Sequence, residues 1–259
     1  MKVNADVFKK YNEIAGIGSM GNFEAKRVEN KLVAAIRSPT VLLKAEMGAE
    51  FVGNEAFVIY VSRMTLNDKY LTNFNPKDVL TITSNEDVLS ITDNKLTMTM
   101  PQLSPEVAKK NTAETMQPKG ANFEGAIKIT FPFDDLSKIL KVAKTMQEMY
   151  VSMVVGSDLK FGVKSKANLV SDAEIANAPE SPKTLYIKMD TAEMAFIGAK
   201  DLVTFEIPNI EKVAPVKFSY SAGDSITVTG FFVPFNPSSL DDDAASESLK
   251  EKEKKGCKK

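Results

Sequence analysis

The sequence predicts an α+β fold made of two similar modules, each with two helices packed on antiparallel sheets. The main observation is an internal repeat, because residues 30–38 resemble residues 157–165 about half a chain length later. An amphipathic segment at 5–17 has a counterpart at 134–146, at nearly the same separation. Short runs of alternating apolar residues fill most of the remaining chain, as antiparallel strands do. A constant separation between matching segments indicates two copies of one module.

The first module, residues 1–100, is predicted to run helix, strands, helix, strands. Phe8, Tyr11 and Ile14 recur at helical spacing within 5–17, and glycines follow that segment. A second helix is expected at 64–74, before Pro76, since proline disfavours a helical residue ahead of it. Strands are expected at 23–28, 31–37, 41–47, 57–62, 79–83, 88–92 and 96–100.

Residues 101–125 break the pattern with prolines and scattered polar residues, so they are predicted to be the linker between the modules. The second module, 126–235, is expected to have helices at 134–146 and 190–199, with Asp134 as the N-cap of the first. Its strands are expected at 126–131, 151–155, 159–164, 168–175, 184–188, 202–207, 216–220 and 226–232. Residues 236–259 form a charged tail that is expected to be disordered, because it holds few large apolar residues.

The composition is that of a globular protein, with 43% hydrophobic and 26% charged residues among 259. The chain has no histidine, which removes imidazole-based catalysis, and its one cysteine is Cys257. We therefore expect no enzymatic activity, no metal site and no cofactor. An apolar run long enough to span a bilayer and a signal-peptide core are both absent from the sequence. We therefore expect no membrane association and a cytoplasmic, nucleoid-associated location, or a nuclear one in a eukaryote.

Lysines recur on the predicted helices of both modules although the formal net charge is −1. Lys138, Lys141 and Lys144 lie roughly opposite the apolar stripe of the helix at 134–146. Nucleic-acid binding would have to depend on such local patches. Lysine is also common on any solvated helix face, and acidic residues such as Glu13 and Asp68 lie among these lysines.

Four segments resemble the DNA sliding clamps of the proliferating cell nuclear antigen (PCNA) family. Residues 35–43, Ala-Ile-Arg-Ser-Pro-Thr-Val-Leu-Leu, are similar to the family's Ala-Met-Asp-x-Ser-His-Val-x-Leu strand turn. Residues 133–141 are similar to the helix that opens the second domain, and 215–220 with 231–235 resemble the closing strands. Arg37, Thr40 and Phe235 stand where the family has aspartate, histidine and lysine, so the resemblance is to a divergent, archaeal or viral member. The likeness spans about residues 1–235.

The resemblance implies a closed homotrimeric ring that encircles double-stranded DNA without sequence preference. Such a ring serves DNA replication and DNA repair as the processivity factor of a DNA polymerase. Its implied partners are that DNA polymerase, a clamp loader and other clamp-binding-motif proteins. By this resemblance, the residues expected to face DNA are Lys9, Lys10, Lys69, Lys138, Lys141, Lys144 and Lys200. A partner-binding pocket is expected to be formed by Ile36, Val41, Pro215, Phe231 and Pro234. The subunit interface is expected to contain Leu96, Met98, Met100, Leu169 and Ile175.

Two other functions are compatible with the same residues. A non-ring DNA-binding accessory factor, for processivity or transcription, would keep the basic helices but not the paired edges. A metal-dependent nuclease would need acidic residues that converge in a cleft, whereas those in the sequence are scattered over turns and strand ends. The acidic triplet 241–243 lies in the charged tail, where a solvated role is favoured over a metal site.

Overall fold

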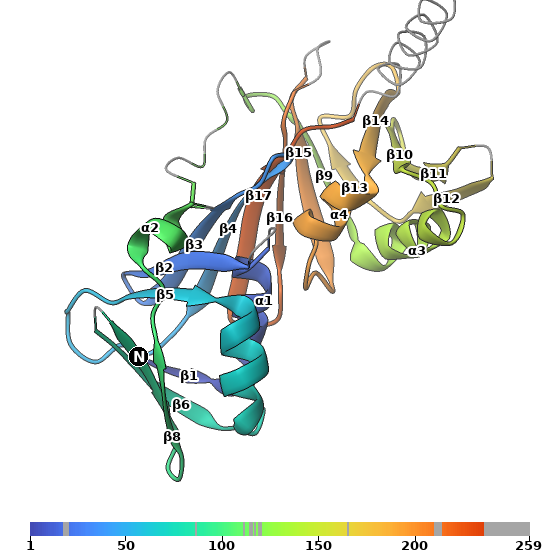
Figure 1. Ribbon diagram of the computed structural model, residues 1–259. Coiled ribbons are helices and arrows are strands. Elements are labelled where there is room, and N and C mark those ends of the chain that lie inside the picture. Colours follow the sequence, from blue (N-terminus) through green and yellow to red (C-terminus); the bar gives the residue numbers. More distant parts are fainter. Residues whose placement is uncertain are drawn as a thin grey trace, which may run out of the picture.

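The chain folds around three antiparallel sheets (Figure 1). The structure is a computed structural model that describes residues 1–17, 21–85, 87–110, 112–113, 116, 118, 121–164, 166–209 and 214–235. One four-stranded sheet has the order β1 (Lys2–Asn4), β6 (Val79–Ser84), β7 (Val88–Thr92) and β8 (Thr97–Pro101). The other has the order β12 (Ala167–Ser171), β11 (Leu159–Val163), β10 (Tyr150–Val155) and β14 (Lys183–Lys188).

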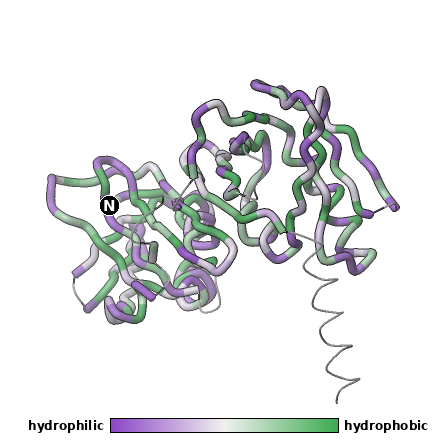
Figure 2. Tube along the Cα trace, turned by 90° about the horizontal axis from the view of Figure 1, so that it is seen from above, coloured by the Kyte–Doolittle hydropathy of each residue, from purple (hydrophilic) through white to green (hydrophobic). Residues whose placement is uncertain are grey.

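The third sheet has nine strands and crosses both halves of the chain. Its order is β13 (Glu174–Ala176), β9 (Ile127–Pro132), β15 (Leu202–Ile207), β16 (Val216–Ser221), β17 (Ile226–Phe232), β4 (Val41–Gly48), β3 (Lys31–Arg37), β2 (Asn22–Val28) and β5 (Val58–Ser62). The halves are joined where β17 pairs with β4, from Ile226 opposite Met47 to Phe232 opposite Val41. Seen from above, the modules form two lobes linked through this sheet (Figure 2).

Alternation along β4 explains which face of the large sheet is covered. Val41, Leu43, Ala45 and Met47 are buried on one face, while the residues between them are partly exposed on the other. Side chains of a strand alternate between faces, so this pattern requires a packed layer on one side only. The helices supply that layer.

Helices α1 (Ala5–Ala15) and α4 (Met189–Ala195) both pack against β4, so they lie on the same face of the shared sheet. The π-helix η1 (Thr65–Tyr70), with the 3-10 turn η2 (Leu71–Asn73), packs on α1, and α3 (Phe133–Thr145) packs on α4. Figure 1 shows these helices gathered on one side of the molecule. The short α2 (Pro105–Lys109) lies elsewhere, against β2 and β5.

The predicted α+β fold with its internal repeat is confirmed by the order of elements. In each half a strand and a helix are followed by a run of strands, β2 to β5 in the first half and β10 to β14 in the second, and then by a second helical segment. The strands at 31–37, 88–92, 202–207 and 226–232 have the predicted bounds. The sequence patterns missed β1 and α2, because segments of three and five residues are too short for a periodic signal.

A helical segment is present where one was predicted, at 64–74, but it is the π-helix η1 followed by the 3-10 turn η2 and contains no α-helix. Polar side chains of this segment donate hydrogen bonds to its backbone carbonyls. The Thr72 hydroxyl donates to the Asp68 carbonyl at 3.0 Å, and the Asn73 amide donates to the Lys69 carbonyl at 2.8 Å. Such local bonds compete with regular helical hydrogen bonds.

Three details of the second module also differ from the predictions. Asp134 is not an N-cap, because α3 begins one residue earlier, after Pro132, and Asp134 lies in its first turn. The strand expected at 168–175 is two strands in different sheets, β12 and β13. Helix α4 ends at Ala195 rather than at 199, because the ring of Phe196 turns into the core and stacks on Phe205 at 5.6 Å.

Candidate functional site

The lysines predicted to face DNA lie on or beside the helices of the covered face. Lys9 and Lys10 are half-buried on α1, Lys69 is exposed on η1, and Lys200 is exposed after α4. Lys138, Lys141 and Lys144 are exposed on α3. The structure therefore brings lysines from both modules to the same side of the shared sheet.

Acidic neighbours neutralise part of this charge. The Lys144 ammonium contacts a Glu193 carboxylate oxygen at 2.9 Å, and Lys138 contacts Asp135 at 3.4 Å. Within the described part of the chain, Lys141 and Lys200 have no ion pair. Exposed ion pairs are worth at most about 1 kcal/mol, so phosphates could replace the acids as partners.

A buried amide pair fixes η1 against α1, which carries two of these lysines. The Asn67 amide donates to the Lys9 carbonyl at 3.2 Å, and the Asn12 amide donates to the Asn67 side-chain oxygen at 3.4 Å. Both asparagines are almost fully buried. Buried polar groups that bond each other resist separation, so the lysine-bearing backbone is held in place.

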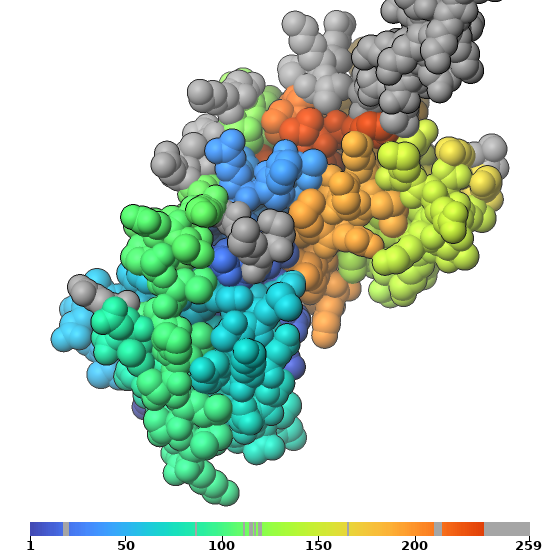
Figure 3. Space-filling view, viewed as in Figure 1, coloured from blue at the N-terminus to red at the C-terminus, as the bar shows by residue number. Residues whose placement is uncertain are grey.

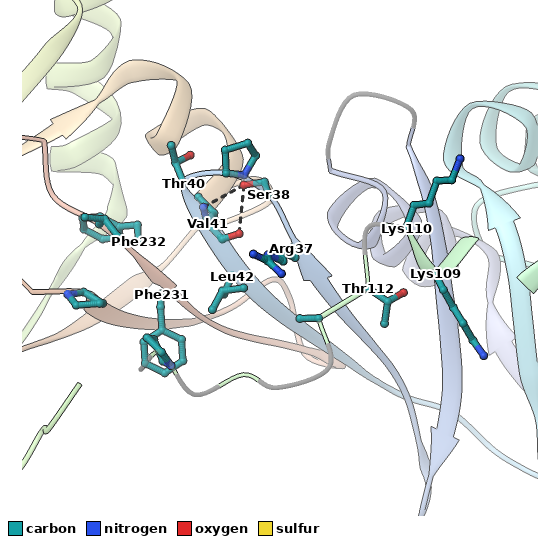
Figure 4. A pocket seen from close by; sticks show the side chains of 15 residues that line it. Arg37, Ser38, Thr40, Val41, Leu42, Lys109, Lys110, Thr112, Phe231 and Phe232 are labelled. Carbon is teal, nitrogen blue, oxygen red and sulfur yellow. Dashed lines mark hydrogen bonds between the residues drawn. The ribbon is translucent and has the colours of Figure 1, made fainter. Parts of the chain in front are cut away.

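A groove of about 1040 Å³ lies beside the β3–β4 turn (Figure 4). It is bounded by the start of β4, the end of β17 and the linker. Figure 3 shows the blue surface of the β3–β4 region meeting the red surface of the C-terminal end of β17. The described residues that line the groove are Arg37, Ser38, Pro39, Thr40, Val41, Leu42, Lys109, Lys110, Thr112, Ala113, Pro118, Pro215, Phe231, Phe232 and Val233.

Three of the five predicted pocket residues, Val41, Pro215 and Phe231, line this groove. Ile36 faces the core and is only 1% exposed, and Pro234 is buried outside the lining. Sequence reasoning missed Leu42, which alternation along β4 places on the groove side. It also missed the contribution of α2, which has no periodic signal.

The linker is attached to the edge of β3. Strand β2 pairs with β3 only up to Val33, so the later residues of β3 lack a strand partner on that side. The Ala113 amide donates to the Ala35 carbonyl at 3.0 Å, and Thr112 forms a bridge with Ile36. These bonds position the linker as one wall of the groove.

The predicted interface residues are only partly brought together. Strands β8 and β12 each end a four-stranded sheet, and Met98 and Leu169 lie on them, half-exposed. Leu96 lies in the preceding turn, where Asp93 accepts hydrogen bonds from the amides of Leu96 and Lys95, which lower the pKa of its carboxyl group.

Two of the predicted interface residues lie elsewhere. Met100 points into the core of its own module and is 3% exposed. Ile175 lies on β13 and pairs with Ile129 in the nine-stranded sheet, so it does not share an edge with Leu169.

Within the described residues, no three acidic or cysteine side chains are grouped so that they could hold a metal ion. The triplet 241–243 and Cys257 lie outside the described residues. None of the described helices has the length and apolar character needed to cross a bilayer.

The two similar modules, the sheet that joins them and the helices on one face are the fold of a DNA sliding clamp of the PCNA type. One similar solved structure is described as the C-terminal region of FEN-1 bound to A. fulgidus PCNA. It has a TM-score of 0.69 and 14% sequence identity, and the match covers 91% of this chain and 97% of that chain. PCNA from Entamoeba histolytica matches with a TM-score of 0.64, 14% identity and coverage of 91% and 98%. No protein-family model matches the sequence, and no curated protein matches it.

Proposed function

We propose that the chain is a DNA polymerase sliding clamp, which closes with two further copies into a ring around double-stranded DNA. The observation that carries this proposal is the arrangement of elements: helices of both modules cover one face of a shared sheet, and β8 and β12 each have an edge without a strand partner among the described residues. A free edge presents unpaired backbone groups that favour pairing with another strand. One edge per module allows each copy to pair with two neighbours and to close a cyclic assembly.

In this proposal the lysines of the helices contact phosphates and make no base contacts, so binding is independent of sequence. Many strong phosphate contacts would hold the protein in place, because each one adds affinity through counterion release. The exposed, partly paired lysines on α3 fit a surface that slides. Retention on DNA then depends on the closed ring.

The groove is the proposed docking site for a DNA polymerase, a clamp loader and other proteins with clamp-binding motifs. Apolar side chains from Leu42 and Phe231, above the buried Val41, offer a surface for aromatic or aliphatic anchors, which dominate the energy of small interfaces. We propose that the protein is a non-enzymatic scaffold for DNA replication and repair, in the nucleoid or the nucleus.

The test compares retention on circular and linearised plasmid, with a clamp loader and ATP supplied. We expect the protein to stay on the closed circle through gel filtration and to be lost from the linear form, because a ring slides off a free end. A plasmid linearised but blocked at both ends by bound protein is the control, and it should restore retention. Equal retention on circular and unblocked linear DNA would contradict the ring and favour a non-ring accessory factor.

A further inference from the structure

The groove described above has a marked charge bias. Its described lining residues include the cations Arg37, Lys109 and Lys110 and contain no carboxylate. Arg37 ends β3, and its side chain lies among the lining residues of the β3–β4 turn, whereas Lys109 and Lys110 come from α2 and the residue after it (Figure 4). Two separate segments therefore place cations along the groove: Arg37 lies beside the apolar residues, whereas the two lysines lie at the far end from Phe231 and point away from it (Figure 4).

Acidic residues of the protein neutralise only part of the positive charge of these three side chains. The Lys109 ammonium lies 3.7 Å from a Glu24 carboxylate oxygen, which is a long distance for an ion pair. The Lys109 side chain is exposed to solvent. Arg37 and Lys110 are exposed, and neither has an ion pair within the described residues. Arg37 is thus available to a bound partner beside the apolar surface, and Lys110 adds positive charge at the far end of the groove.

We propose that the groove selects partner segments that combine an apolar anchor with acidic flanking residues. This inference rests on the proposed docking role of the groove and adds the charge of its partners. Leu42 and Phe231 would contact the anchor, while a carboxylate would reach Arg37, whose guanidinium can donate two parallel hydrogen bonds. A segment with lysines at the same flanking positions is rejected by like charge, which provides discrimination without new contacts.

The test uses the full chain and short fluorescein-labelled peptides that share one leucine and one phenylalanine anchor. The peptides differ only in whether their flanking residues are all glutamate, all lysine or all glutamine. At low salt we expect fluorescence anisotropy to show about tenfold tighter binding of the glutamate peptide than of the lysine peptide. Added salt should reduce this ratio, because the cations are exposed.

The double variant Arg37→Glu and Lys110→Glu should reverse the preference for the glutamate peptide. The double variant Lys77→Glu and Lys160→Glu, at exposed positions outside the groove lining, makes the same change in net charge, so it is the matched control and should leave the preference unchanged. Phe231→Ala should weaken binding of all three peptides. A ratio near one in the unmodified protein, a ratio that survives the double variant, or no binding of any peptide would overturn the proposal.

The same preparations should be tested for retention on circular DNA. Retention without charge selection would refute this inference and leave the ring proposal intact. Charge selection without retention would support the groove and refute the ring.

Discussion

Gly230 lies at a tightly packed position of β17, the strand that joins the two modules. A side-chain carbon at this residue would collide with the ring of Phe218 and would lie too close to the backbone carbonyl oxygen of Leu42. Strand β17 runs between β16 and β4 here, so both neighbouring strands restrict the space. A glycine within a strand often marks such a close approach.

We expect Gly230→Ala to lower the free energy of unfolding by about 1–3 kcal/mol, as overpacking does in a dense core. Urea unfolding followed by circular dichroism measures this change. Gly48→Ala, in the paired strand β4, is the matched control, because the nearest atom to its new carbon is 3.8 Å away. The control should change stability by less than about 0.5 kcal/mol. Equal effects of the two substitutions would show that the crowding around Gly230 relaxes without cost.

At the scale of elements, the sequence predicts segments whose burial repeats regularly. The helix at 5–17 was predictable because Phe8, Tyr11 and Ile14 recur on one face, and all three are fully buried. The segment at 64–74 has similar apolar spacing, but its threonine and asparagine side chains bond backbone carbonyls and change the helix type. The break between β12 and β13 depends on which sheet each segment joins, and local alternation does not contain that information.

Helix α3 is the element on which the proposed DNA contact can be tested. Lys138, Lys141 and Lys144 are exposed and two of them make only exposed ion pairs, so changing all three to glutamate should leave the module folded. We expect DNA-dependent stimulation of the polymerase to fall several-fold, with a weaker dependence on salt, since phosphate contacts account for that dependence.

The matched control for α3 is a triple lysine-to-glutamate variant of Lys26, Lys77 and Lys160, which are exposed on strands or a turn and produce the same change in net charge. Thermal unfolding checks that both triple variants are folded. Stimulation that is unchanged in the α3 variant, or lowered equally in the control, would remove α3 from the proposed DNA-facing surface.

At the scale of the whole molecule, the repeat predicted two similar modules, but it did not predict how they join. The pairing of β17 with β4 links residues 226–232 with residues 41–47, far apart in the sequence, and neither strand has a local signal for its partner. The groove has the same origin, because it forms where that pairing, the β3–β4 turn and the linker meet. Single residues such as Val41 and Phe231 were identified through the resemblance, whereas the cations of α2 required the folded structure.

Strand β8 provides the sharpest test of ring closure. The Asp93 amide donates to the Leu96 carbonyl at 3.0 Å, and the Gln102 amide donates to the Asp87 carbonyl at 2.7 Å. Because hydrogen-bonded pairs alternate along an antiparallel ladder, Ser90 and Thr99 form a pair whose backbone groups do not bond each other. The backbone N–H of Thr99 therefore points away from β7, toward the free edge of the sheet.

Thr99→Pro would remove that N–H without removing a backbone hydrogen bond inside the module, which is the position where an edge strand tolerates proline. It also removes the 3.3 Å hydroxyl contact between Thr99 and Ser90, which Thr99→Ala removes equally. We expect light scattering at micromolar concentration to give a trimer for the unmodified protein and a folded monomer for Thr99→Pro. Thr99→Ala, which keeps the N–H, is the matched control and should remain trimeric. A trimer that survives Thr99→Pro would show that β8 is not paired with a neighbour, and a monomeric unmodified protein would contradict a ring formed by this chain alone.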